Sequence, residues 1–164
     1  MPRSDLIIRP VTSSDAAELA GLLNAIIAGG GTTALETAFT PAALADAYLT
    51  GPGVHCCFVA EADGRLAGFQ TLGRQPDLPA SIGDIATFTR IGGTQAGVGS
   101  ALFAATCDSA RLLGLAAINA TIRADNAGGL TFYSRMGFVD HDVIPSVPLR
   151  DGTPVDRIRK RFQL

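Results

Sequence analysis

The chain has 164 residues, of which 47% are hydrophobic and 17% are charged, and this composition excludes an intrinsically disordered protein. A net charge of −2 and a pI of about 5.6 exclude a strongly basic chain, so neither nucleic acid nor an anionic membrane is an expected partner. The Met-Pro-Arg start has no apolar leader and no run approaches the roughly 20 apolar residues of a membrane span, so we expect a cytoplasmic protein.

Hydrophobic residues alternate between helical and strand periods along the chain. Apolar residues from Leu19 to Ile27 have helical spacing, and Thr40-Pro41 is typical of a helix start. With no internal repeat and no linker, we expect a single α/β domain with a mixed sheet over residues 1–164. The predicted elements are a strand at 6–11, helices at 12–27 and 40–49, strands at 54–61, 65–74 and 81–91, a helix at 99–113, a strand at 116–123, a short helix within 124–138, and two strands within 139–164.

Three cysteines, Cys56, Cys57 and Cys107, have no Cys-x-x-Cys spacing and no nearby histidine and aspartate cluster. We therefore expect no metal site, and we interpret the cysteines as buried thiols of the core. His55, next to two of them, is either a base or a histidine with a structural partner.

The stretch GGTQAGVGSALF, residues 92–103, connects a predicted strand to a predicted helix and contains no lysine or arginine. A helix start presents unpaired backbone N–H groups, and small residues let a phosphate approach them. The stretch lacks the Gly-Lys-Ser/Thr of a P-loop and the third glycine of a dinucleotide fingerprint. It indicates either a phosphate site of another kind or a flexible turn without a ligand.

This turn, the strand INATIRADN and the segment GGLTFYSRMGF together resemble the GNAT acetyltransferase superfamily. The order of elements over residues 6–162 is similar as well, most strongly over 84–139, which would form the coenzyme-binding core. The resemblance implies an α+β layered domain with a mixed, mostly antiparallel sheet and about four flanking helices. It also implies an acetyl-CoA-dependent N-acetyltransferase that needs no metal.

In the family, backbone amides of the glycine turn bind the pyrophosphate of acetyl-CoA, and the strand before it pairs with the pantetheine arm. Thr94 stands where the family has arginine or glutamine, and Gln95 is the nearest replacement. The coenzyme-binding residues implied by the resemblance are Phe88, Thr89, Arg90, Gln95, Ala96, Gly97, Val98, Gly99, Ser100, Asn126 and Tyr133. Asn126 is equally suited to cap a helix.

Tyr133 matches the family's tyrosine near the coenzyme sulfur, which acts as general acid, and a phenol stays protonated at pH 7. The alternative role of Tyr133 is that of a core aromatic residue. For a general base, Asp84 is the first candidate and Glu36 the second, although either carboxylate is also compatible with a solvated surface position.

The segment NAIIAGGGTTALETAFTP, residues 24–41, loosely resembles the acceptor loop of the phosphinothricin acetyltransferase branch, which implies a small, amino-acid-like primary amine as acceptor. Arg74, Arg90 and Arg123 are candidate carboxylate clamps or surface charges. The alternative function is a non-catalytic acyl-CoA-binding sensor or interaction domain on the same scaffold. A homodimer is also expected, because terminal strands of this scaffold often pair between subunits.

Overall fold

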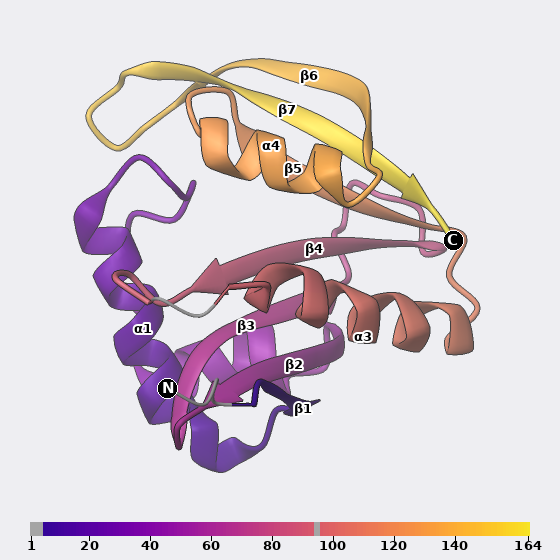
Figure 1. The fold of residues 1–164 in the computed structure, drawn as a ribbon. Helices are drawn as coiled ribbons and strands as arrows, with labels where there is room; N and C mark the ends of the chain where they lie inside the picture. Colours follow the sequence, from indigo (N-terminus) through magenta and orange to yellow (C-terminus); the bar gives the residue numbers. More distant parts are fainter. Residues whose placement is uncertain (1–4, 94–95) are drawn as a thin grey trace.

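The computed structural model of the chain describes residues 5–93 and 96–164. In these residues, seven strands form one sheet with four α-helices packed on its two faces (Figure 1). A 3₁₀ turn at Ser13–Asp15 precedes the first helix, and a π-helical turn at Ala45–Leu49 extends the second. The strands are β1 (Ile7–Pro10), β2 (Val54–Ala62), β3 (Arg65–Gly73), β4 (Ile82–Thr89), β5 (Ala117–Arg123), β6 (Val139–Pro148) and β7 (Pro154–Gln163), and the helices are α1 (Ala16–Gly29), α2 (Pro41–Leu44), α3 (Val98–Leu112) and α4 (Ala127–Arg135).

The strand order in the sheet is β1-β2-β3-β4-β5-β7-β6. Every neighbouring pair is antiparallel except β4 and β5, which are parallel and are connected through α3. A parallel pair requires such a crossover connection, whereas the antiparallel pairs need only turns. The expected α/β domain with a mixed, mostly antiparallel sheet and about four helices is confirmed.

The sheet separates two layers of helices, because side chains alternate between its faces. On β2, Cys57 and Val59 pack with α1 and α2, whereas Ala60 packs with Val98 and Leu102 of α3. We call these two sides the α1 face and the α3 face. The aromatic end of α4 joins the α3 face, where Tyr133 packs against Phe138. No helix in the described part of the chain is long and apolar enough to cross a membrane.

Candidate active site

β4 and β5 are paired over only part of their length. Ile82–Ile85 of β4 pair with Ala117–Ala120 of β5. Beyond this point β4 continues to Thr89, paired with β3 alone, and β5 continues to Arg123, paired with β7 alone. Among the described residues, Ala86–Thr89 therefore have one free strand edge. Such an edge can pair with an extended, amide-bearing ligand as with an added strand.

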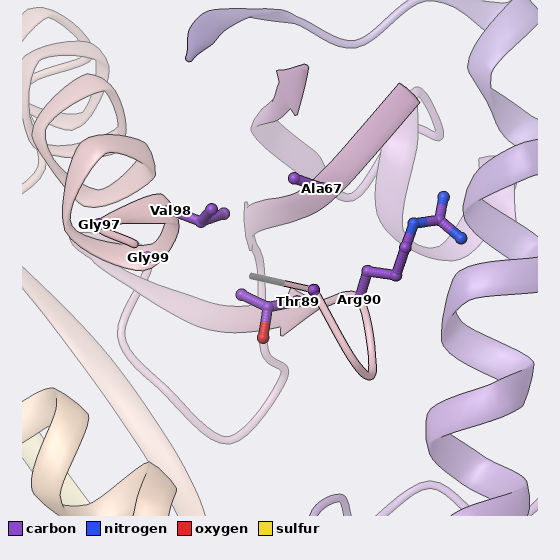
Figure 2. Close-up of a pocket in the computed structure, with 7 residues that line it drawn as sticks. Ala67, Thr89, Arg90, Gly97, Val98 and Gly99 are labelled. Carbon is purple, nitrogen blue, oxygen red and sulfur yellow. The ribbon is translucent and has the colours of Figure 1, made fainter. Parts of the chain in front are cut away.

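The first turn of α3 lies next to the end of this free edge and lines a pocket of about 230 Å³. Amides at a helix start have no intrahelical acceptor and carry a partial positive charge, so the pocket suits a phosphate group. It is smaller than the roughly 300–1,000 Å³ of a typical ligand pocket, and it would hold only one end of a coenzyme. The lining residues are Ala67, Thr89, Arg90, Gly93, Gly97, Val98 and Gly99 (Figure 2).

The two glycines at the start of α3 are required for different reasons. Gly97 is the N-cap residue and has a φ of +78°, in the left-handed region that side chains disfavour. Gly99 allows α3 to approach α4, because a Cβ atom there would lie 2.6 Å from Cε2 of Phe132. Thr94 and Gln95, the positions at which we expected a side-chain contact, lie outside the described residues.

The residues at the end of β4 take three different environments. Phe88 is buried on the α1 face against Phe69, with ring centroids 5.1 Å apart, so only its backbone faces the free edge. Thr89 is exposed and lines the pocket. Arg90 also lines the pocket, but its guanidinium points away from the α3 turn and donates to Glu18 of α1 at 2.8 Å (Figure 2).

Asn126 acts as the cap of α4. Its Oδ1 accepts from the amide of Gly129 at 3.0 Å, and its Nδ2 donates to the carbonyl of Thr32 at 3.1 Å. The capping interpretation is therefore confirmed, and the same side chain holds the loop that follows α1. At the glycine turn, Ala96 is exposed, and Ser100 Oγ donates to the carbonyl of Gly97 at 3.2 Å.

Tyr133 belongs to a buried chain of three polar side chains on the α3 face. Its hydroxyl lies 2.9 Å from Oγ1 of Thr87, on the free-edge segment of β4. Gln70 of β3, which is fully buried, donates from Nε2 to the same Thr87 oxygen at 2.9 Å. Burial raises the pKa of Tyr133 to about 12. The phenol therefore keeps its proton at neutral pH, next to the point where β4 and β5 separate.

Asp84 belongs to a second polar cluster, on the α1 face. Asn119 of β5 donates from Nδ2 to Oδ1 of Asp84 at 2.8 Å, and Arg161 of β7 donates to Asn119 Oδ1 at 2.8 Å. Burial raises the pKa of Asp84 above its ordinary value, although the Asn119 donor opposes the shift. Burial raises the pKa of Tyr48, and the charge of Asp84 raises the pKa of Tyr48 and of Tyr133 further. Asp84 is therefore a carboxylate with increased basicity within electrostatic reach of the Tyr133 phenol.

The second candidate base lies in the loop after α1. Glu36 is exposed, and its Oε2 accepts from the backbone amide of Arg150 at 2.9 Å. Arg123 forms a bidentate ion pair with Asp125 and donates to the carbonyl of Thr33 at 3.2 Å. Glu36 and Arg123 thus both hold this loop.

Arg74, a further candidate clamp, lines a separate pocket of about 480 Å³ with Pro52, Pro79 and Ile82, at the opposite end of β4 from the glycine turn. Among residues 5–93 and 96–164, no three His, Cys, Asp or Glu side chains are grouped so that they could hold a metal ion.

Several polar residues of the site were not among those expected from the sequence. Gln70, Thr87 and Asn119 are polar residues inside otherwise apolar strands, which is the pattern that could have identified them. Their partners could not be identified, because each hydrogen bond joins residues of different strands or a strand and a helix.

One family model matches the chain, and many solved structures have a similar fold. The model of the "Acetyltransferase (GNAT) family" matches residues 31–138, and no curated protein matches the sequence. A phosphinothricin acetyltransferase from Sinorhizobium meliloti, solved in complex with AcCoA, is 18% identical with a TM-score of 0.84, over 97% of this chain and 88% of that one. The ribosomal-protein-alanine N-acetyltransferase from Brucella melitensis is 19% identical with a TM-score of 0.81, over 96% and 99%. A GCN5-related N-acetyltransferase from Kribbella flavida is 20% identical with a TM-score of 0.83, over 97% and 98%.

Proposed function

The chain belongs to the acetyltransferase (GNAT) family, and we propose that it transfers the acetyl group of acetyl-CoA to a primary amine of a small, amino-acid-like acceptor. One observation carries the proposal: the free edge of Ala86–Thr89 leads from the Tyr133 hydroxyl to the pocket at the start of α3. When bound, acetyl-CoA supplies an activated acetyl group and a thiol leaving group. The acetyltransferase from Sinorhizobium meliloti, which has the same fold and contains AcCoA, supports this choice of co-substrate.

The coenzyme fits the residues at both ends of the free edge. The amides of the turn, from Ala96 through Ser100 and with Gln95 as a further candidate, would bind the pyrophosphate. The backbone from Phe88 to Arg90 would pair with the pantetheine arm as an added strand and would place an amide at the acetyl carbonyl. Asn126 would contact the coenzyme from the start of α4. Residues 84–139 would thus form the coenzyme-binding core.

Tyr133 is the proposed general acid. Thr87 accepts from Gln70, so its own hydroxyl proton is free to be donated to the Tyr133 oxygen. In this arrangement the proton of Tyr133 has no acceptor among the described residues and is available to the departing sulfur. Tyr133 therefore holds a proton that it can transfer during a direct attack of the amine in a ternary complex.

Asp84 is the proposed general base. Its partly buried carboxylate accepts one hydrogen bond from Asn119 at Oδ1, and it would take the proton of the acceptor amine directly or through a water molecule. Glu36 is the second candidate, from the loop that we expect to line the acceptor site. The bond between Glu36 and the Arg150 amide suits a structural role better than proton transfer.

The first test is thermal stabilisation by acetyl-CoA, by CoA and by ATP. Either coenzyme at millimolar concentration should raise Tm, because a ligand that binds only the folded state stabilises it. Absence of stabilisation would contradict both the coenzyme site and the reaction. A thiol-release assay with a panel of amines then separates the enzyme from a non-catalytic acyl-CoA sensor, which would bind the coenzyme without releasing thiol.

We also propose a cytoplasmic homodimer. β6 is an outer strand of the sheet, and its Val139 and Val143 side chains are 65% and 52% exposed. An outer strand with apolar side chains is suited to pairing between subunits. Sedimentation equilibrium at micromolar concentration measures the assembly directly, and a monomer would contradict this part of the proposal.

A further inference from the structure

Arg157 of β7 is a buried arginine, one nitrogen atom of which has no hydrogen-bond acceptor among the described residues. The residue is 7% exposed, and its Nη1 atom is buried and unpartnered. The other arginines on this face of β7 differ: Arg159 donates twice to Asp142, and Arg161 donates to Asn119. A buried N–H group without an acceptor destabilises the fold, and Nη1 of Arg157 needs an acceptor that the described residues do not provide.

The neighbours of Arg157 increase the positive charge instead of neutralising it. Its partner in the β5–β7 register is Arg123, so the two guanidiniums extend from the same face of the sheet. Arg123 already uses three nitrogen atoms, two on Asp125 and one on the carbonyl of Thr33. Asp125 is half-exposed, and its pKa is lowered by the hydrogen bonds from Arg123 and further by the charges of Arg123 and Arg157. One carboxylate therefore serves two guanidiniums.

Arg157 of β7 and Asp84 of β4 extend from the same face of the sheet, on the two strands that flank β5. Asp84 pairs with Asn119 of β5, and Arg157 pairs with Arg123, four positions further along that strand. Four strand residues span about 13 Å along β5, and the two strands that flank β5 lie about 10 Å apart across the sheet. The flexible stem of the arginine shortens the resulting gap between the guanidinium and the Asp84 carboxylate. The segment between the two positions is where β4 and β5 separate.

We propose that Arg157 binds a carboxylate of the acceptor, so that the enzyme acetylates amines that also carry a carboxylate. The proposal rests on the proposed acetyl transfer and assigns the acceptor clamp to a residue that the sequence patterns did not single out. A planar guanidinium binds a carboxylate through two parallel N–H···O bonds, which fixes the orientation of the ligand as well as its position. The carboxylate of the acceptor also neutralises the excess positive charge of Arg123 and Arg157.

The test compares L-α-amino acids and ω-amino acids with their carboxamides as acceptors, using acetyl-CoA and the intact chain. The wild type should prefer the acids by about 10- to 100-fold in kcat/KM, the loss typical of one charged hydrogen-bonded pair. Arg157→Met should abolish this preference and leave the carboxamide rates within about twofold. Arg65→Met, which removes the same charge at an exposed position, is the control and should keep the preference.

A second readout does not depend on turnover. Without ligand, Arg157→Met should raise Tm, because it removes a buried cation whose Nη1 has no hydrogen-bond acceptor among the described residues. Millimolar amino acids should stabilise the wild type and not the variant, even if no amine is acetylated. The proposal is overturned if the wild type acetylates carboxamides and amino acids with the same kcat/KM. It is also overturned if Arg157→Met lowers kcat/KM for acids and carboxamides by the same factor, or if amino acids raise the Tm of wild type and variant equally. Failure of acetyl transfer alone, with this stabilisation intact, contradicts the reaction and not the carboxylate site.

Discussion

The hydroxyl of Tyr133 is useful as an acid only if its proton points toward the leaving group. Tyr133→Phe should therefore lower kcat by about 10²- to 10⁴-fold, the range for a general acid, with little change in the Kd of acetyl-CoA. Steady-state kinetics with isothermal titration separates the two effects. A variant with full activity at every pH would contradict the general-acid role.

Thr87 should act through Tyr133, because its hydroxyl lies 2.9 Å from the phenol oxygen. Thr87→Val removes the donor at nearly constant volume and should lower kcat about 2- to 10-fold, whereas Thr87→Ser should restore it. The chain has only two tyrosines, so ¹³Cζ-tyrosine NMR gives one resonance for Tyr133 and one for Tyr48. Only the Tyr133 resonance should move in Thr87→Val. Equal losses in the serine and valine variants would indicate a purely structural role.

The ionised carboxylate of Asp84 should lower the stability of the fold at neutral pH while it supports catalysis. Its folded-state pKa is raised by burial, so its contribution to folding is most favourable below the unfolded pKa of about 3.9 and is lost as the pH rises through the folded value. Asp84→Asn should therefore raise Tm at pH 8 and not at pH 4, while kcat falls about 10²- to 10⁴-fold. Thermal unfolding across this pH range measures the first effect.

A matched carboxylate variant gives the control. Glu36→Gln changes an exposed carboxylate to its amide in the same way, and it should lower kcat far less than Asp84→Asn does. If Glu36→Gln abolishes turnover while Asp84→Asn does not, the assignment of the base is reversed.

At the scale of elements, the contact between α3 and α4 limits what can stand at position 99. Gly99→Ala would place Cβ 2.6 Å from Cε2 of Phe132 and should destabilise the protein by about 1–3 kcal/mol, as overpacking does. Urea unfolding measures the loss. Phe132→Leu in the same chain should recover part of it, because it removes the opposing ring atoms. A Gly99→Ala variant as stable as the wild type would mean that the helices separate at no cost.

The order of strands and helices could be predicted from the sequence because it depends on local periodicity, as in the buried stripe from Leu19 to Ile26 of α1. The glycine turn was also identified locally, but the packing reason for Gly99 was not, because Phe132 is more than thirty positions away. The separation of β4 from β5 after Ile85, and the partners of Thr87 and Asp84, depend on pairings between distant segments. No local pattern encodes such pairings.

At the scale of the whole molecule, the loop after α1 is held by elements from both ends of the chain. Asn24 of α1 exchanges two hydrogen bonds with the backbone of Phe39, at 2.8 and 2.9 Å. From the C-terminal half, Arg123 and Asn126 donate to loop carbonyls, and Arg150 in the β6–β7 turn donates to Thr37 and Glu36. The loop that we propose to line the acceptor site is therefore positioned by contacts with distant parts of the described fold and not by its own sequence.

Loosening this loop from one end should weaken acceptor binding without affecting the coenzyme. Asn24→Ala removes both bonds to Phe39 and should speed amide hydrogen exchange of residues 30–39 by about 10- to 100-fold, since two hydrogen bonds contribute about 1–3 kcal/mol. The KM of the amine should rise, while the Kd of acetyl-CoA stays constant, because the proposed coenzyme contacts belong to β4, α3 and α4. Asn24→Asp, which keeps the acceptor for the Phe39 amide, should show a smaller effect on both exchange and KM. Faster exchange with an unchanged KM would show that the loop does not form part of the acceptor site.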